Sequence, residues 1–566
     1  MLSRRHVLYG GLGAITLGLR RSCGLPAFTF APDPARFAPL ADLPLNLPVE
    51  NVAGLPFATR MTGDPFPNPH RLFPGIHAGH PPLPVPDVPH EYADIVVIGG
   101  GISGLASAYL LRDRHPIVLE LGPRFGGNAR GERWRGINYS LGGAYVITPD
   151  DGTFLDTLYR ELRLDQVVRV SIDDEMVELG GHILPGFWDG IGVPPADVPA
   201  FTAFAELVTR MAEKDYPEIP LPKGDVQWIL DLDVMTFRAH IERELGGRLP
   251  DTLVAGIQSY CYSSFGGGWE EISAASGWNF LAAEEFGRWV CPGGNAYIAH
   301  AMWQALAAME DPMHPRLRAA APVHDVRLRD DGVLVSYLLP ENRLHAVLAE
   351  NVVMACPKHV AKYLLHDLAR LDPEKRAAMD TLQSRAYVVI NVLLDRAVEL
   401  DFYDIFLLGD ATAYPHNEDE AAADSRVADV LSGHFAHVPT GDVPRSVLTL
   451  YWPLPWSTGR QTLVEGADSW RDYAERVAPQ IRRILRMLDV PELFVRQIRM
   501  TAWGHAMPLA RPGHIADGTA EALRRPFAER IHFVHQDNWA LPAVENCLLD
   551  AETVAAAIRA GAAAGV

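Results

Sequence analysis

The sequence is poor in cysteine, and this scarcity excludes several classes of protein. Five cysteines stand among 566 residues. None of them forms a C-x-x-C pair or a spacing typical of zinc sites, so we predict no bound metal. A disulfide framework needs a much higher density of cysteine. We expect buried free thiols, with a Cys261–Cys291 pair as the alternative. The five are Cys23, Cys261, Cys291, Cys356 and Cys547.

Long apolar runs and an excess of basic charge are also absent. The apolar stretch over residues 7–19 is shorter than the roughly 20 residues that span a bilayer, and no other stretch is long and apolar enough. The chain carries 50 Lys and Arg against 70 Asp and Glu, a formal net charge of -20. A surface of this sign repels nucleic acid and anionic lipid and attracts cations. We therefore expect no nucleic-acid partner.

The N-terminus has the pattern of an export signal. Arg4 and Arg5 precede the apolar stretch, and a basic start before a short apolar run is typical of secretory signals. Paired arginines at this place are typical of the twin-arginine route, which carries folded proteins. We predict a twin-arginine signal over residues 1–25 and a periplasmic location, with a buried N-terminal helix as the alternative. Arg20 and Arg21 stand where a cleavable signal has small neutral residues, so removal of the signal stays open.

Residues 26–90 are rich in proline and lack periodic apolar spacing. This composition predicts an extended segment rather than a domain. The scattered Phe and Leu residues favour packing of this segment over the folded body, and a disordered linker is the alternative.

A dinucleotide-binding pattern follows this segment. The apolar run over 95–98 predicts a buried strand, and Gly99, Gly101 and Gly104 stand in a turn before a predicted helix. Gly99 permits the tight turn, Gly101 leaves room for a pyrophosphate, and Gly104 lets helix and strand approach. Glu120 ends the next predicted strand, 21 residues after Gly99, where a carboxylate accepts both ribose hydroxyls. The neighbouring residues in this predicted cofactor site are Ile102, Ser103 and Leu121.

The residues after Glu120 resemble those of the flavin amine oxidase superfamily. Phe125-Gly126-Gly127-Asn128-Ala129 is closest to the loop of bacterial spermidine dehydrogenase-like flavoproteins. The resemblance implies non-covalent FAD, with a phosphate contact from Arg130 and an acid, Asp537, on the ribityl chain. It also implies that a helix starting at Val544 points at the flavin, where a helix N-terminus stabilises negative charge. The other residues that it places at the cofactor are Gly127, Asn128, Gly142, Gly143, Ala144 and Val323.

The chain departs from the superfamily pattern at three positions. Asn128 stands where most members have arginine, and Gln536 and Asn546 stand where many have glycine. These departures leave the geometry around the flavin open.

Aromatic and acidic residues mark the predicted substrate side. Trp503, His505 and Trp539 are the predicted catalytic-site residues, since aromatic faces attract cations and shape an amine-sized slot. Core packing is the alternative for each of them. Lys358 and Lys362 follow a strand that leads to the cofactor, where some relatives hold a lysine near flavin N5. The acids that could contact a cation are Glu270, Glu271, Glu284 and Glu285.

The patterns together predict an α/β fold with a Rossmann-like FAD domain and an interleaved α+β substrate domain. The FAD domain takes residues 91–150, 291–370 and 500–566, and the substrate domain takes 151–290 and 371–499. Helices are predicted over 102–111, 153–162, 199–214, 294–308, 469–488 and 544–560. Strands are predicted over 95–98, 116–120, 352–355, 445–453 and 531–534, with a hairpin over 323–337.

The predicted function is oxidation of the C–N bond of an amine, possibly a polyamine, by hydride transfer to flavin N5. The alternatives are desaturation or oxidation of a hydrophobic substrate and a non-catalytic flavoprotein subunit. Oxygen, a quinone and a cytochrome remain open as electron acceptors, and the sequence does not determine the oligomeric state.

Overall fold

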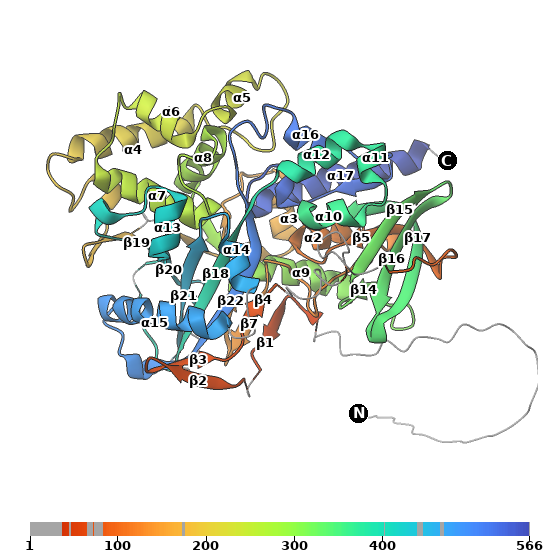
Figure 1. Ribbon diagram of the computed structural model, residues 1–566, viewed down its shortest axis with the longest axis horizontal. Coiled ribbons are helices and arrows are strands. Elements are labelled where there is room, and N and C mark those ends of the chain that lie inside the picture. The colour runs from red at the N-terminus through yellow and green to blue at the C-terminus, as the bar shows by residue number, and fades with distance from the viewer. Residues whose placement is uncertain are drawn as a thin grey trace, which may run out of the picture.

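The computed structural model describes residues 37–44, 47–64, 72, 83–171, 176–400, 402–437, 445–464 and 469–564. The predicted signal over residues 1–25 lies outside these residues. Two large sheets dominate the molecule, one at the right and one at the left of Figure 1. Across the described ranges, no helix has the length and apolarity needed to cross a membrane.

The first sheet has seven strands and holds the dinucleotide-binding pattern. Its spatial order is β14-β6-β5-β17-β16-β15, and β23 pairs with β17. The pairs β5–β6, β5–β17 and β17–β23 are parallel, while β15, β16 and β17 form an antiparallel extension. The strands are β5 (Glu91–Ile98), β6 (Ile117–Leu119), β14 (Leu317–Arg318), β15 (Val323–Arg329), β16 (Gly332–Leu339), β17 (Arg343–Met354) and β23 (Ile531–Phe533).

Alternation along β5 explains why helices cover both faces of this sheet. Ile95 and Val97 are buried in one core cluster, with α2 (Ile102–Leu110), α9 (Asn295–Ala307) and α17 (Val544–Ala564). Val96 and Ile98 are buried in another, with α10 (Lys358–Leu364), α12 (Pro373–Thr381) and α16 (Thr519–Arg524). Successive side chains of a strand point to opposite faces, so a continuous apolar run needs cover on both sides.

The second sheet has ten strands in the order β12-β11-β19-β20-β21-β18-β22-β3-β2, with β4 paired to β22. It gathers strands from distant parts of the chain. They are β2 (Val49–Val52), β3 (Leu55–Ala58), β4 (Thr62–Gly63), β11 (Met176–Leu179), β12 (His182–Leu184), β18 (Ser384–Leu394), β19 (Asp404–Gly409), β20 (Asp429–Ser432), β21 (Ser446–Leu454) and β22 (Val495–Pro508).

Helices and two small sheets complete the fold. The remaining helices are α3 (Phe154–Glu161), α4 (Val198–Glu213), α5 (Gln227–Asp233), α6 (Phe237–Glu244), α7 (Asp251–Phe265), α8 (Ala274–Leu281), α11 (Leu368–Leu371), α13 (Glu418–Asp424), α14 (Gly459–Val464) and α15 (Ser469–Met487). One small sheet joins β1 (Leu40–Asp42), β7 (Gly131–Trp134) and β8 (Ile137–Ser140). The other joins β9 (Val146–Ile147), β10 (Arg169–Ser171) and β13 (Arg288–Val290).

The α/β fold is confirmed, and the predicted elements appear close to their expected bounds. The main differences are that β5 and β17 begin earlier than the apolar runs that predicted them. The additional N-terminal residues of these strands include exposed ones such as Tyr92. Backbone pairing with the neighbouring strand places them in the sheet although their side chains are not buried.

The Pro-rich segment forms four short strands between residues 40 and 63. Residues 40–64 contribute β1 to a small sheet and β2, β3 and β4 to the second sheet. Leu55 and Phe57 are buried in the main core cluster. Strand β22 crosses the predicted domain boundary at residue 500, because its 14 residues run continuously along the second sheet.

A buried ion pair ties β22 to the small sheet of β7 and β8. The Nη2 and Nε atoms of Arg499 donate to the carboxylate of Glu132 at 2.7 and 3.2 Å. The hydroxyl of Tyr139 donates to the same carboxylate at 2.5 Å. Arg499 and Glu132 are both buried. Each charge depends on the other, because an unpaired ion in the interior is strongly disfavoured.

Replacing Arg499 by alanine is expected to lower the free energy of unfolding by about 3–5 kcal/mol, because Glu132 keeps its buried charge without a partner. Urea unfolding followed by circular dichroism measures the change. Arg471→Ala is the control, since it removes an exposed ion pair with Glu50 and is expected to cost about 0–1 kcal/mol. Equal effects of the two substitutions would contradict the assignment.

Candidate functional site

A large cavity of about 1200 Å³ is lined by residues of both large sheets. It exceeds the usual 300–1,000 Å³ of pockets for drug-sized ligands, so it has room for a dinucleotide and a second molecule. Most of the predicted cofactor residues line it. They are Gly99, Gly101, Ile102, Ser103, Glu120, Leu121, Gly127, Asn128, Arg130, Gly142, Gly143, Ala144, Val323 and Val544.

The glycine turn places the start of α2 against this cavity. Gly99 has a φ of +110°, and a Cβ atom there would lie 2.4 Å from the carbonyl oxygen of Ala355. A Cβ on Gly104 would lie 1.8 Å from the carbonyl oxygen of Gly99, so helix and strand meet backbone to backbone. Gly101 caps the helix without a side-chain hydrogen bond. The first N–H groups of α2 therefore face a space that suits an anion.

Glu120 is fixed beside this turn by two backbone donors. The N–H of Gly100 donates to Oε2 at 2.7 Å, and the N–H of Gly122 donates to Oε1 at 2.6 Å. Burial raises the pKa of the Glu120 carboxyl above its usual value, and these two donors offset part of that rise. The carboxylate lines the cavity, at the place where a ribose is expected.

Arg130 is held on three sides. Its Nε donates to the carbonyl of Gly127 at 2.9 Å, and its Nη2 donates to the carbonyl of Gly63 at 2.7 Å. The guanidinium carbon lies 4.8 Å from the ring centroid of Trp503. The Trp503 indole N–H in turn donates to the carbonyl of Leu141 at 2.7 Å. Arg130 and Trp503 thus form a fixed cation–π pair in the cavity wall.

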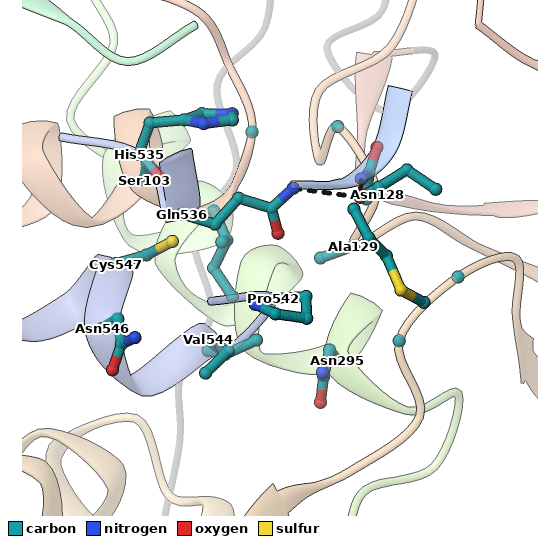
Figure 2. A pocket seen from close by; sticks show the side chains of 18 of the residues that line it. Ser103, Asn128, Ala129, Asn295, His535, Gln536, Pro542, Val544, Asn546 and Cys547 are labelled. Atoms are coloured by element: carbon teal, nitrogen blue, oxygen red, sulfur yellow. Dashed lines mark hydrogen bonds between the residues drawn. The ribbon is translucent and has the colours of Figure 1, made fainter. Parts of the chain in front are cut away.

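Two departures from the superfamily pattern meet at one carbonyl. The side-chain amides of Asn128 and Gln536 donate to the carbonyl oxygen of Ala506 at 3.1 and 3.0 Å. Figure 2 shows Gln536 extending toward Asn128 across the cavity. Both amides line the cavity, and together they hold the end of β22 against it. A carbonyl has two lone pairs, so it accepts both donors.

The start of α17 forms another wall. Val544, Asn546 and Cys547 line the cavity, and the Cys547 side chain has a hydrogen bond with Ser103 on α2. Elsewhere in the lining, the Tyr451 hydroxyl donates to the carbonyl of Gly142 at 2.8 Å. A helix N-terminus at this position favours negative charge in front of it.

Asp537 and Trp539 lie outside the cavity lining, unlike their predicted positions. Oδ2 of Asp537 accepts the backbone N–H of Lys358 at 2.7 Å, which fixes the start of α10. Burial raises the pKa of Asp537, but His535 outweighs it and keeps that pKa below its usual value. Trp539 is buried, and its indole N–H donates to Asp550 at 3.2 Å. Neither side chain is among those that line the cavity, and their roles at the ribityl chain and at the substrate stay predictions.

His505 lines the cavity in a stack with a second histidine. Its ring centroid lies 3.5 Å from that of His359, and Arg460 Nη1 lies 3.4 Å from its Nε2. Burial and the neighbouring His505 hold the pKa of His359 well below its usual value. A neutral His359 removes the repulsion that two stacked imidazolium rings would have. A catalytic role of His505 stays a prediction.

A group of buried carboxylates lines the cavity on the side of the second sheet. Arg288 Nη1 donates to Asp404 at 2.9 Å, and Arg288 Nε lies 3.6 Å from Glu284. The Tyr145 and Tyr260 hydroxyls donate to Glu284 at 2.8 and 3.1 Å. We call this group, with Asp429, the acidic chamber. Its three carboxylates face one arginine, so acidic groups outnumber basic ones in it.

Asp429 is the least compensated member of the acidic chamber. Its Oδ2 accepts the hydroxyl of Ser263 at 3.4 Å, and its Oδ1 has no hydrogen-bond partner in the described parts of the chain. Burial, and then Asp404, raise the pKa of Asp429 well above its usual value. A buried acceptor without a donor is costly, which points to a missing ligand.

The structure separates the other acids and lysines that the sequence indicated. Glu284 and Lys362 line the cavity. Glu271 instead pairs with Arg385 at 2.5 Å, and Lys362 Nζ pairs with Asp380 at 2.9 Å. Glu270 and Glu285 lie outside the lining. Lys358 is buried outside it, with its Nζ 5.5 Å from the Phe533 ring centroid.

Several residues that line the cavity were not predicted from the sequence. Asp404 and Asp429 open the apolar strands β19 and β20, and an acid beside such strands was the available signal. Asp64 lies in the Pro-rich segment, for which the sequence predicted no site residue.

Within the described ranges, no group of three or more His, Cys, Asp or Glu side chains could hold a metal ion. The four described cysteines are free thiols.

Known proteins resemble this chain in sequence or in fold. Oxidoreductase PigB of a Serratia species is 24% identical over 533 residues, which covers 83% of this chain and 75% of that protein. Cyclohexylamine oxidase from Brevibacterium oxydans superposes with a TM-score of 0.58 at 17% identity, covering 82% of this chain and 98% of that one. Putrescine oxidase with bound putrescine superposes with a TM-score of 0.57 at 17% identity, covering 83% and 99%.

The two superpositions establish the fold of a flavin amine oxidase, with its Rossmann-like cofactor domain. A family model described as flavin containing amine oxidoreductase matches residues 102–424, which is more than half of the 566 residues. The chain therefore belongs to the flavin-containing amine oxidoreductase family and is an oxidoreductase with a flavin cofactor.

Proposed function

We propose that the protein binds FAD non-covalently and oxidises the C–N bond of an amine, with polyamines as the leading class. The observation that carries this proposal is the acidic chamber, which lies in the same cavity as the glycine turn. A buried group with three carboxylates and one arginine suits a cation. It suits a hydrophobic polyene poorly, since an alkyl chain would cover the unpaired Oδ1 of Asp429.

The cavity residues fit FAD. The open helix start at Gly101 suits the pyrophosphate, and Glu120 suits the ribose. Arg130 offers a fixed positive charge to the phosphates, and the start of α17 suits the flavin ring edge that becomes negative on reduction. Cys356 and Cys547 line the cavity, and burial raises the pKa of both thiols to about 12. Such thiols stay protonated, which favours non-covalent binding.

Bound FAD supplies the hydride acceptor, N5, for the carbon beside the amine nitrogen. The chain's own residues bind and orient the amine. An amine that enters as an ammonium ion must give up a proton before its lone pair can help to expel hydride. Oδ1 of Asp429 can hold that proton, because its raised pKa makes the carboxylate a stronger base. The imine product then hydrolyses in water.

The relatives support this reading without fixing the substrate. Cyclohexylamine and putrescine are the amines in the names of two neighbours of the same fold. We expect the electron acceptor to be oxygen, a quinone or a cytochrome. Mixing the reduced protein with each of these identifies the acceptor as the one that reoxidises the flavin.

The purified protein is expected to be yellow and to release intact FAD on denaturation. Gly101→Val should reduce the flavin content to less than about a tenth, because a branched side chain would occupy the pyrophosphate space. A Cβ atom alone fits at Gly101, with its nearest contact at 3.6 Å, so the protein should still fold. Absorbance and circular dichroism measure both properties. Gly561→Ala on α17, with open space around it, is the control. Full flavin content in Gly101→Val would refute this placement.

Anaerobic mixing with spermidine, putrescine and a simple monoamine tests the reaction. At least one amine is expected to bleach the flavin absorbance, and the rate should rise with pH because the neutral amine reacts. A hydrophobic polyene should leave the flavin oxidised. The opposite result would remove the amine proposal and leave only the family assignment.

Asp429→Asn is the matched variant for the same experiment. It keeps the shape of the side chain but loses the charge, so reduction by the amine is expected to slow by about tenfold or more. FAD binding should remain unchanged. Asp419→Asn, an exposed acid on α13, is the control. Identical rates for both variants would show that the acidic chamber does not bind the amine.

We also propose export by the twin-arginine route to the periplasm, which is supported by Arg4 and Arg5 before the apolar stretch. Changing both arginines to lysine should retain the protein in the cytoplasm, because that route reads the pair. Fractionation of cells that carry a reporter fusion measures this. Unchanged export of the double variant would exclude the assignment.

A further inference from the structure

The N-terminal segment contributes to the cavity from outside the family region. The family match begins at residue 102, yet Asp64, which directly follows β4 in this segment, lines the cavity. It does so beside three residues of the predicted cofactor and substrate site, namely Arg130, Trp503 and His505. The segment is therefore more than a cover over the folded body.

Strand β4 fixes where this segment enters. Thr62 and Gly63 pair in parallel with Thr501 and Ala502 of β22, and the hydroxyls of Thr62 and Thr501 lie 2.9 Å apart. Gly63 has a φ of +116°, and a Cβ atom there would lie 2.0 Å from the carbonyl oxygen of Ala502. Glycine is required at this position, because the two backbones leave no room for a side chain.

Asp64 then joins the segment to the part of β22 that carries two predicted site residues. Its Oδ2 accepts the backbone N–H of Gly504 at 2.8 Å, and it also accepts the N–H of His505. Its own N–H donates to the carbonyl of Ala502 at 3.0 Å. Asp64 thus orients the backbone at Ala502, Gly504 and His505, and Trp503 lies between these positions.

The same segment orients Arg130. The carbonyl of Gly63 accepts Arg130 Nη2, while Gly127 accepts Nε and the ring of Trp503 covers a face of the guanidinium. Burial raises the pKa of Asp64, and the charge of Arg130 offsets part of this rise. The acid and the arginine therefore interact electrostatically in the cavity wall.

We propose that Asp64 is a positioning residue of the flavin site, through which the N-terminal segment holds Arg130 and residues Trp503–His505 of β22 in their binding geometry. The inference rests on the proposed binding of FAD in this cavity. Its consequence is that the affinity for FAD depends on a segment that precedes the nucleotide-binding strand β5. Fixing the side chains before the ligand arrives lowers the cost of binding.

The chain offers a matched control for this proposal. Asp233 is also a buried acid whose Oδ2 accepts two successive backbone N–H groups, from Ile515 at 2.8 Å and Ala516 at 3.0 Å. It lies outside the cavity lining. Loss of its carboxylate removes the same kind of hydrogen bonds without touching the flavin site.

The experiment titrates apoprotein with FAD, followed by flavin fluorescence, and measures urea unfolding of the same apoproteins. Asp64→Ala is expected to bind FAD at least about tenfold more weakly. The substitution removes the carboxylate that accepts the N–H groups of Gly504 and His505 and interacts with the charge of Arg130. Asp64→Asn keeps an acceptor but no charge, so its affinity should lie between those of the wild type and Asp64→Ala. Asp233→Ala should lower the unfolding midpoint while FAD affinity stays within about twofold.

Wild-type affinity in Asp64→Ala would overturn the proposal. So would an equal loss of affinity in Asp64→Ala and Asp233→Ala, since that would trace the effect to general stability. If Asp64→Ala does not fold, the comparison of Asp64→Asn with Asp233→Asn decides between the same outcomes. A wild-type protein that binds no FAD would instead refute the proposed cofactor, so the two failures are distinguishable.

Discussion

The contact between the Gly99 turn and the first turn of α2 is the constraint on which the cofactor end of the molecule depends. A Cβ on Gly104 would lie 1.8 Å from the Gly99 carbonyl oxygen, so only hydrogen at that position permits the approach. The approach brings the start of α2 to the cavity and places the Gly100 N–H on the Glu120 carboxylate. Helix, turn and acid therefore act as one rigid unit for binding a dinucleotide.

The cavity is polarised between its two ends. Arg130 and the start of α2 face it from the cofactor side, whereas Asp404 and Asp429 of the second sheet face it from the other side, together with Glu284. A dianionic pyrophosphate and a cationic amine would each find the opposite charge there. The family accounts for the flavin cofactor, and under the proposed function the acidic chamber attracts the cationic substrate.

Two residues that depart from the family pattern contact the same backbone group near the end of β22. Asn128 and Gln536 each replace a residue that the family usually has, yet both donate to the Ala506 carbonyl. The N-terminal segment supplies further contacts to the same end of β22 through Gly63 and Asp64. This chain thus holds the β22 end of its flavin site by side-chain amides and an added strand.

The sequence by itself determined the α/β class, the strand–turn–helix at Gly99 and the acid at Glu120, because this chemistry is local to one short stretch. It also indicated Trp503 and Trp539 equally. Only the tertiary structure decided that Trp503 faces the cavity under Arg130, while Trp539 turns to Asp550 inside the protein. The acidic chamber was hidden for the same reason. Asp404 and Asp429 are far apart in sequence, and the pairing of β19 with β20 brings them beside Arg288. Local pattern fixes backbone conformation, whereas the direction of a side chain depends on residues that arrive from elsewhere in the chain.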